Sequence, residues 1–430
     1  MKKIRLISAI LICFLLLPLT ACSTKDNYSW EAVSEKNYEH ITTVNKPDGV
    51  SVRTITFDDL APEGYTLEQS WDAMGIDDRD RVYIGWTSMR SDGKEDFVVF
   101  RYDNATGERK FLGTFMQASK EANNLGDDEQ IPKGHTRMIF LNGKMYMGSQ
   151  SFHDFKKEID ELPNYRGSHI YVYDIQKEKL EDISAGLPDG VVTKNQGIVA
   201  MTCIPEENLL VGLTHPHSDI VLFDIKKNAV REVIPGIPWE LGNPLSREIV
   251  AANSGKIYTY RGTEDPEDRY SQHNMWEYDM KTREMKETSQ KFTEGFWNGQ
   301  AETKDGKNFY ISTSNGRLYV INTEDDSVTS LGQFLPLEQL NEGKLINYMY
   351  SITLSKDEKK IYAMPSADYG FLYEYDIESR KVSEVTSLGK AIYTGNNIID
   401  SHGNFYFAAF KPWSGDGRLL VIDLSHKSEK

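Results

Sequence analysis

Cysteine is scarce in this sequence, with three residues in a chain of 430. Cys13 lies in an N-terminal segment that we expect to be removed, and Cys22 lies in a motif for lipid attachment described below. Cys203 is then the only thiol left, so no disulfide can form within the mature chain. We therefore expect Cys203 to be a buried strand thiol, in a fold stabilised by its apolar core.

Basic residues are also few. The chain has 49 Lys and Arg against 65 Asp and Glu, which makes a formal net charge of −16 at pH 7. Removing Lys2, Lys3 and Arg5 with the N-terminal segment leaves 46 basic and 65 acidic residues, a net charge of −19. Such a chain opposes general binding to nucleic acid or anionic lipid, although it is compatible with a local basic pocket. We expect no nucleic-acid partner.

The spacings typical of cofactor and metal sites are missing. The chain has no C-x-x-C, H-E-x-x-H or G-x-S-x-G, and no phosphate loop or G-x-G-x-x-G in a suitable context. The run DDRD at 77–80 lacks the Gly and the closing Glu of an EF-hand loop. We predict no cofactor. The one metal arrangement open to the sequence combines His215 and His217 with His135 or His153.

The first 22 residues, MKKIRLISAILICFLLLPLTAC, have the pattern of a processing segment. Basic residues precede an almost uninterrupted apolar run from Leu6 to Leu19. The following Thr-Ala-Cys completes a sequence that resembles the bacterial lipobox, which implies cleavage before Cys22 and lipidation of its thiol. We expect a signal peptide over 1–21, a lipidated Cys22, and a protein held to the extracytoplasmic side of a membrane by lipid alone, at the cell surface or in a periplasm.

Residues 22–49 are polar and lack sustained periodicity. We expect a tether that holds the domain away from the membrane. The alternative is a short ordered extension packed on the domain, because Tyr28, Trp30 and Tyr38 could dock there.

One pattern recurs seven times along the rest of the chain. A hydrophobic strand ends in Asp or Asn and is followed by a polar turn and a short alternating strand, as in YVYDIQKEKLEDI from Tyr171. Repeats of this length with several strands each are typical of β-propeller blades. The anchor residues are about 53 positions apart on average and are Asp103, Asp174, Asp224, Asp279, Asn322, Asp376 and Asp423.

These repeats predict an all-β fold over 50–430. We expect a seven-bladed β-propeller of four-stranded antiparallel blades. The last repeat ends without room for its fourth strand, whereas residues 50–57 form a clean alternating strand before the first blade. We predict that this segment closes the ring, because an open ring would leave unpaired strand edges. With its lipobox, the chain resembles bacterial extracytoplasmic lipoproteins with seven-bladed propellers.

Extra chain length gathers on one face of the predicted propeller. The loops between second and third strands (B–C) and those between blades (D–A) lie on the same face, and in blade 2 both are long, over 114–134 and 149–169. Loops on a rigid scaffold often carry function. Five of nine histidines map to this face, with His169 at its margin: His135, His153, His215, His217 and His273.

The mouth of the central channel is predicted to be polar. The starts of the inner strands are Trp71 or Asp72, His135, Gln196, Arg247, Asn298, Tyr350 and Asn396. The surrounding loops add cations and flat aromatic residues, among them Arg90, Tyr165, Arg166, Tyr260, Arg261, Trp297 and Trp413. Sugar rings stack on aromatic side chains and Arg binds carboxylate or sulfate in bidentate fashion, so the mixture suits an anionic glycan.

In its architecture, the chain is similar to the polysaccharide lyases that use a seven-bladed propeller. That resemblance implies β-elimination across a uronate linkage, with Arg247 neutralising the uronate carboxylate, Tyr260 or His153 as the base and His135 as the acid. It also implies a substrate-binding surface made of His215, His217, Gln196, Arg261, Asn298, Trp297, Tyr350, Asn396 and Trp413.

Two other functions are open to the same sequence. A non-catalytic surface lipoprotein would present this face to a glycan or a protein partner. A sugar-lactone hydrolase, which also occurs on propellers, would need a carboxylate-rich metal site in the channel, and Asp72 is the only acidic residue among the inner-strand starts.

Overall fold

The computed structural model places most of the chain beyond the N-terminal segment. It describes residues 40–46, 49–151, 165–236, 248–261, 272–293, 297–313, 316–334, 348–366, 370–389, 392–411 and 416–424. The predicted signal peptide, Cys22 and most of the predicted tether lie outside the described residues.

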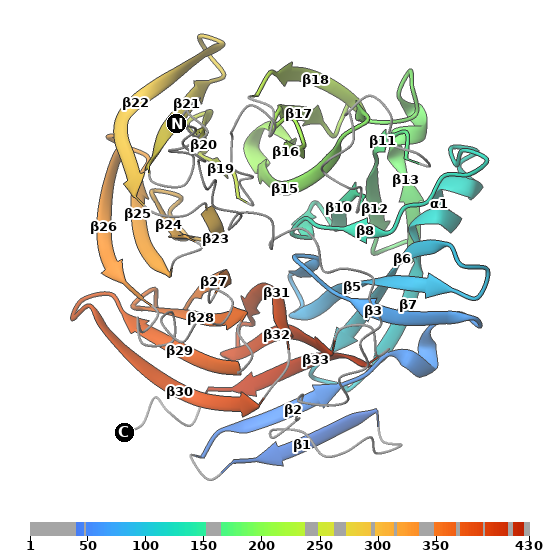
Figure 1. Cartoon of the computed structure of the whole chain (residues 1–430), viewed down its shortest axis with the longest axis horizontal. Helices are drawn as coiled ribbons and strands as arrows, with labels where there is room; N and C mark the ends of the chain where they lie inside the picture. The colour runs from blue at the N-terminus through green and yellow to red at the C-terminus, as the bar shows by residue number, and fades with distance from the viewer. Residues whose placement is uncertain are drawn as a thin grey trace, which may run out of the picture.

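Seven antiparallel sheets stand around a central axis, which confirms the predicted β-propeller (Figure 1). The inner strand is in two pieces in blades 1 and 2. Blades 1 to 3 contain β3 (Tyr65–Gln69), β4 (Met74–Ile76), β5 (Arg81–Arg90), β6 (Glu95–Asp103) and β7 (Arg109–Thr114); β8 (Lys133–Gly134), β9 (Ile139–Leu141), β10 (Lys144–Gln150), β12 (Ile170–Asp174) and β13 (Lys179–Asp182); and β15 (Gly197–Ile204), β16 (Leu209–His215), β17 (Ile220–Asp224) and β18 (Ala229–Ile234).

The other four blades follow the same order from the axis outward. They contain β19 (Val250–Ala251), β20 (Lys256–Arg261), β21 (Gln272–Asp279) and β22 (Glu284–Thr293); β23 (Trp297–Glu302), β24 (Asn308–Thr313), β25 (Arg317–Asn322) and β26 (Ser327–Gln333); β27 (Tyr348–Leu354), β28 (Lys360–Ser366), β29 (Gly370–Asp376) and β30 (Lys381–Gly389); and β31 (Ile392–Ile399), β32 (Asn404–Lys411) and β33 (Asp416–Asp423). A short ribbon of β11 (Gly167–Ser168) and β14 (Thr193–Lys194) lies beside blade 2.

The N-terminal strand closes the ring, as predicted. Strand β2 (Ser51–Ile55) pairs with β33 in antiparallel register, with Val52 opposite Ile422. A further strand, β1 (Ile41–Asn45), pairs with β2 and makes the last blade five-stranded. Residues 41–45 fall within the predicted tether, so this part of it is an ordered extension that covers the edge of the closing strand.

The recurrent anchor residue shapes the turn after the third strand in blades 1 to 6. In blade 1 the Oδ1 atom of Asp103 accepts the backbone N–H of Ala105 at 2.9 Å. The Oδ1 atoms of Asp279 and Asn322 do the same for the residues two positions on, at 2.7 and 2.9 Å. This is the Asx turn, which explains why Asp or Asn recurs there for structural reasons.

Apolar layers between the blades make the core. The ring of Phe57, just after the closing strand, stacks on Phe100 of blade 1 at 4.9 Å. The inner strands of blades 1 and 2 approach closely, because a Cβ at Gly75 would lie 2.3 Å from the carbonyl oxygen of Met138. Cys203 is half-buried, and burial raises the pKa of its thiol to about 12, as expected for an inert strand cysteine.

Blade 1 has a long second and third strand instead of a long loop between them. Strands β5 and β6 form a ribbon joined by a tight turn at 91–94, in which Gly93 adopts a φ of 80°. Among the described residues no helix is long and apolar enough to cross a bilayer.

Candidate functional site

Several predicted site residues fall outside what the structure describes, or are described only by their backbone. His153, Arg247 and Trp413 lie outside the described residues. The backbone places the remaining predicted polar positions in inner or second strands. These are Arg261 in β20, Asn298 in β23, Tyr350 in β27 and Asn396 in β31.

Two predicted ligand contacts are packing residues in this structure. The side chains of Tyr260 and Trp297 are buried, with 2% and 0% of their surface exposed. Their rings meet edge to face at 5.5 Å, and Phe292 packs on Trp297 from the other side. Because both rings are closed to solvent between blades 4 and 5, neither one is placed where a catalytic base or a stacking platform would meet a ligand.

Gln196 is also engaged within the fold. Its Nε2 donates to Asp219 at 2.9 Å, and its Oε1 accepts the hydroxyl of Thr214 at 2.5 Å. These bonds brace the loop between β16 and β17. In the same loop His215 is buried, and His217 is half-buried with its Nδ1 3.9 Å from Asp219. The amide of Gln196 therefore supports the loop instead of reaching outward.

His135 lies at the inner end of blade 2, beside the predicted channel. Its Nδ1 is 3.2 Å from Oδ2 of Asp72 in blade 1 and 3.0 Å from the carbonyl oxygen of Val199 in blade 3. Both neighbours accept hydrogen bonds, so we assign the ring hydrogen to Nδ1. The side chain is 2% exposed. Asp72 and His135, which were both predicted at the starts of inner strands, thus lie against each other in a buried setting.

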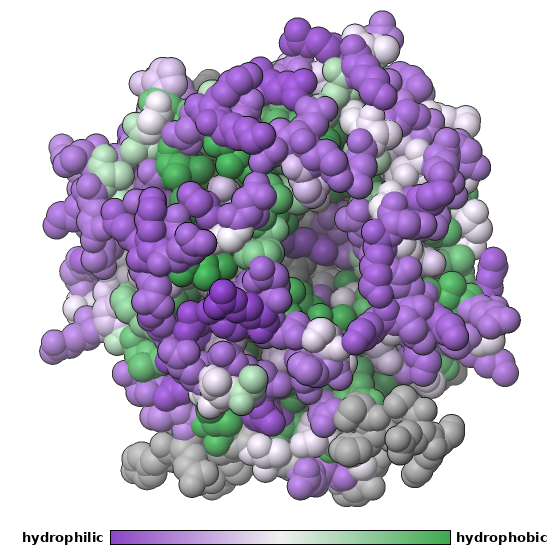
Figure 2. All heavy atoms as spheres, turned by 180° about the vertical axis from the view of Figure 1, so that it is seen from behind, coloured by the Kyte–Doolittle hydropathy of each residue, from purple (hydrophilic) through white to green (hydrophobic). Residues whose placement is uncertain are grey.

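A second polar bridge crosses the axis. The Nη2 atom of Arg137 in blade 2 donates to Glu248 at 3.0 Å and to the carbonyl oxygen of Gln300 in blade 5 at 2.7 Å. Burial raises the pKa of Glu248, and the charge of Arg137 opposes that rise. Figure 2 shows the face opposite to Figure 1, hollowed at its centre around hydrophilic residues. The propeller axis is thus polar, with its described charges paired across blades.

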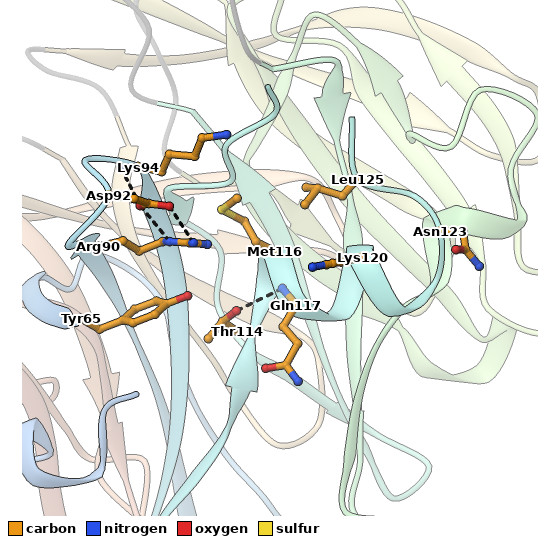
Figure 3. Close-up of a pocket in the computed structure, with 10 residues that line it drawn as sticks. All are labelled: Tyr65, Arg90, Asp92, Lys94, Thr114, Met116, Gln117, Lys120, Asn123 and Leu125. Carbon is orange, nitrogen blue, oxygen red and sulfur yellow. Dashed lines mark hydrogen bonds and ion pairs between the residues drawn. The ribbon is translucent and has the colours of Figure 1, made fainter. Parts of the chain in front are cut away.

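A pocket on the loop-bearing face lies farther out, between blade 1 and a short helix (Figure 3). The helix, α1 (Phe115–Glu121), belongs to the long connection from β7 to β8, and Thr114 caps it by accepting the N–H of Gln117. The pocket has a volume of about 650 Å³. Its lining comes from the β5–β6 turn, the start of β3 and the helix, and comprises Tyr65, Arg90, Asp92, Lys94, Thr114, Met116, Gln117, Lys120, Asn123 and Leu125.

Positive charge dominates this pocket. Arg90 forms a bidentate pair with Asp92, at 3.1 and 2.8 Å, and its guanidinium lies 5.7 Å from the centre of the Tyr65 ring. Among the described residues that line the pocket this is the one ion pair, and Lys94 and Lys120 have no carboxylate within ion-pair distance in the described chain. The lining carries three cations and one carboxylate, in a chain with a net charge of −16.

A buried carboxylate joins the two walls of the pocket. Asp96 is fully buried; its Oδ2 accepts the hydroxyl of Tyr65 at 3.0 Å, and its Oδ1 accepts the N–H of Met116 in α1 at 3.0 Å. Burial and the charge of Asp96 raise the pKa of Tyr65 to about 12, so the phenol stays neutral and donates. Asp96 thereby fixes the position of the Tyr65 side chain relative to the start of the helix.

Behind α1 lies a cluster of four charged side chains, which we call the clamp and define as Glu129, Arg166, His169 and Asp182; the two carboxylates and the imidazole are buried, and the Arg166 side chain is 40% exposed. Nδ1 of His169 is 2.9 Å from Asp182, and its Nε2 is 3.3 Å from Glu129. The other oxygen of Glu129 accepts Nε of Arg166 at 2.9 Å. Two cations and two anions form a neutral set that ties the connection from β7 to β8 to blade 2.

Sequence reasoning found this region but not its residues. It identified the long connections of blade 2, Arg90 as a cation of this face, and His169 at its margin. It expected Arg166 and Tyr165 to face a ligand, whereas Arg166 pairs with Glu129 and Tyr165 is buried against Ser149. Lys94 follows an Asp-Gly turn, a hairpin signal that would have placed its side chain at the tip of a ribbon.

The geometry on this face combines a cationic pocket, a paired His and Asp at the inner strands, and a neutral clamp. Comparison of the chain with protein-family models gave no match, and a search of curated proteins gave none either.

Proposed function

We propose that this protein binds an acidic saccharide, of the uronate-containing or sulfated kind, in the pocket between blade 1 and α1. The observation that carries the proposal is the excess of cations there. Arg90, Lys94 and Lys120 converge on about 650 Å³ of open space in a strongly acidic chain. Unpaired cations at one place on such a surface concentrate anions by long-range attraction.

The rest of the lining suits a sugar better than a simple ion. Met116 and Leu125 offer apolar surface, and Gln117 and Asn123 offer amides that can bond hydroxyl groups. Most saccharide hydroxyls are neutral, so a pocket that binds an acidic sugar needs both kinds of group. Arg90 is already oriented by Asp92, which lowers the entropy lost when a carboxylate or sulfate binds.

A binding assay with matched ligands tests this proposal. Isothermal titration with uronate oligosaccharides, sulfated oligosaccharides and their neutral counterparts should show binding of the acidic ligands alone. Lys94→Gln and Lys120→Gln should each weaken binding by about tenfold, since a hydrogen bond to a charged group is worth roughly 1.5–3 kcal/mol. Lys226→Gln, an exposed lysine in the β17–β18 turn, is the control. Equal affinity for neutral and acidic ligands would refute the proposal.

We also propose that the domain is displayed outside the cytoplasm on a lipid attached to Cys22. The lipobox-like residues 19–22 and the polar stretch that follows them support this placement. Cys22→Ala should move the protein from the membrane pellet to the soluble fraction, because one lost lipid anchor removes most of the membrane affinity. Cys203→Ser should leave the distribution unchanged, and retention of the Cys22 variant in the pellet would contradict the anchor.

β-Elimination is the second candidate function, and the Asp72–His135 pair is the observation that bears on it; because the His135 side chain is 2% exposed, the reaction requires the inner-strand ends to open to the substrate. An imidazole oriented by a carboxylate is a common acid or base arrangement. In such a reaction a base removes the C5 proton of the uronate, the bond from C4 to the leaving oxygen breaks, and an acid protonates that oxygen. The test is a rise in ultraviolet absorbance from unsaturated uronate, absent in His135→Ala. With a folded protein and no rise on any uronate polymer, the binding function stands alone.

A further inference from the structure

One wall of the pocket is attached to blade 2 through several contacts, among them the stacked rings of Phe115 and Tyr171 at 3.8 Å, and a buried carboxylate receives two of the polar ones. Ser119 in α1 donates its hydroxyl to Oδ2 of Asp182 at 2.7 Å, and Nδ2 of Asn124, just after the helix, donates to the same oxygen at 2.9 Å. The helix carries Lys120, one of the three pocket cations. Asp182 itself lies at the end of β13, an outer strand of blade 2. The position of Lys120 therefore depends on how firmly Asp182 is held.

Asp182 shares its Oδ2 with His169, whose ring bridges two carboxylates. Nδ1 faces Asp182 and Nε2 faces Glu129, which belongs to the same connection as α1. Carboxylates only accept hydrogen bonds, so both ring nitrogens carry hydrogen and His169 is an imidazolium. Neutral His169 has one N–H, so one of the two buried carboxylates would then lose one of its donors, and both would lose the neighbouring positive charge.

The remaining described groups around His169 do not supply a replacement charge. The ring of Tyr171 in β12 stacks on it at 5.8 Å, and the hydroxyl of Tyr171 bonds to Ser119 at 2.7 Å. The charge of Arg166 reaches the cluster through Glu129. The side chain of His169 is 0% exposed, so water cannot take the place of the lost N–H without opening the cluster.

We propose that His169 and Asp182 are positioning residues for the pocket, and that the positive charge of His169 holds Lys120 in its anion-binding position. The inference rests on the proposed function, because it concerns the affinity of the same pocket. Loss of the charge leaves a buried carboxylate short of a partner and loosens the connection over 115–134. The cation on α1 then no longer converges with Arg90 and Lys94, and anion affinity falls.

The direction of the pH dependence follows from the same contacts. Burial alone would lower the pKa of His169, but the hydrogen bonds and charges of Asp182 and Glu129 raise it above its ordinary 6.5. The imidazolium therefore persists to higher pH than that of an ordinary histidine and is lost as the pH rises through this elevated pKa. Affinity should be highest in mildly acidic solution and should decline toward alkaline pH.

A strongly acidic probe isolates this effect. Sulfate esters keep their charge across the range, and so do Lys and Arg side chains, so titration of a sulfated oligosaccharide from about pH 6 to about pH 9 reports mainly on histidine. We expect affinity to fall by about fivefold or more as His169 deprotonates, which NMR of ¹³C-labelled histidine would follow. Hydrogen exchange over 115–134 should quicken in the same range.

Three variants separate positioning from general stability. Lys120→Gln should bind weakly at every pH and lose the pH dependence, because the effect acts through that ammonium. Ser119→Ala should weaken binding while leaving the histidine titration in place. His402→Gln, an exposed histidine in the turn between β31 and β32 and outside the clamp, should keep the wild-type profile.

The outcomes distinguish the two proposals. Binding that stays constant while His169 titrates overturns the inference and leaves the proposed function intact. A pH dependence that persists unchanged in Lys120→Gln also overturns it. An absence of binding at every pH overturns the proposed function, and the inference falls with it.

Discussion

The clamp and the pocket lie on opposite sides of the same short helix, and both gather charge, but in opposite ways. In the clamp, two anions and two cations pair within 3.3 Å, and the carboxylates and the imidazole are buried. In the pocket Lys94 and Lys120 face open space without an ion-pair partner among the described residues. A charge taken out of water needs a partner, whereas one left in water does not. The paired charges of the clamp therefore hold structure, whereas Lys94 and Lys120 remain available to a ligand.

Removing one clamp partner should have the largest effect. Asp182→Ala leaves the imidazolium and the donors of Ser119 and Asn124 without their acceptor, and it should lower the free energy of unfolding by about 3–5 kcal/mol. Urea denaturation followed by fluorescence measures this. Asp224→Ala, a carboxylate in an exposed turn of blade 3, should cost no more than about 1 kcal/mol. Similar losses in the two variants would erase the distinction between clamp and surface.

Stability should also depend on pH through the clamp. Burial would raise the pKa of Glu129, but hydrogen bonds from His169 and Gly126 lower it to about 2 from an ordinary 4.5. Its stabilisation is complete above pH 4.5 and is lost as the pH falls toward 2. The stabilisation from His169 is complete below pH 6.5 and is lost as the pH rises through its elevated pKa. The clamp is therefore strongest from pH 4.5 to 6.5.

The measurement is the free energy of unfolding across this range. In wild-type protein the free energy of unfolding should fall at acidic pH, and Glu129→Gln should reduce this fall by roughly 2–3 kcal/mol. The pocket variant Lys94→Gln should keep the wild-type dependence on pH at both the acidic and the alkaline end. If Glu129→Gln loses as much stability at acidic pH as the wild-type protein does, the clamp is not the cause of the acid sensitivity.

An intermediate effect is expected at the boundary between the two regions. Tyr65 lines the pocket but donates to the buried Asp96, so Tyr65→Phe removes one donor from a fully buried carboxylate. We expect a loss of about 1–2 kcal/mol in stability and a modest loss of affinity. Tyr319→Phe, in blade 5 and away from the pocket, serves as the affinity control. A loss of stability as large as that of Asp182→Ala would mean that Tyr65 is mainly a structural residue, as the residues of the clamp are.

The smallest change in stability should come from the unpaired lysine of the β5–β6 turn. Lys94→Gln should alter the free energy of unfolding by no more than about 0.5 kcal/mol, because no described ion pair is lost. The same variant is expected to weaken ligand binding. A loss of affinity without a loss of stability is therefore the result that distinguishes the pocket from the clamp. A clear destabilisation would mean that Lys94 has a structural partner.

Much of the fold could be predicted because its signals are local. Asp103 and five of its six counterparts bond to the backbone two or three residues onward, so the turn is encoded within a few positions. The alternation in residues 50–57 likewise predicted the closing strand, and β2 confirms it. An ordered segment within 22–49 was only the alternative to a tether, whereas residues 41–45 form a strand. A strand that pairs with the edge of a sheet has no distinctive sequence pattern, so it was not predicted.

The site was harder to predict because burial depends on the whole assembly. Tyr260 and Trp297 looked like exposed aromatics of the channel face, yet both are packed between blades. His169 looked marginal and proves to be the centre of the clamp. The sequence pointed to Arg90 but not to Lys94 and Lys120, the other two cations of the pocket. The turn and the helix that bring these lysines close to Arg90 were expected to be irregular loops.

The sequence by itself determined the seven blades, their turns and the closure of the ring, because strand alternation and turn chemistry act between neighbouring residues. Only the tertiary structure decided which charges are paired. Glu129 meets His169 across 40 positions and Asn124 meets Asp182 across 58, distances over which no local pattern operates. Lys94 and Lys120, which have no such partner among the described residues, remain available to a ligand in the pocket, and only the folded structure shows this.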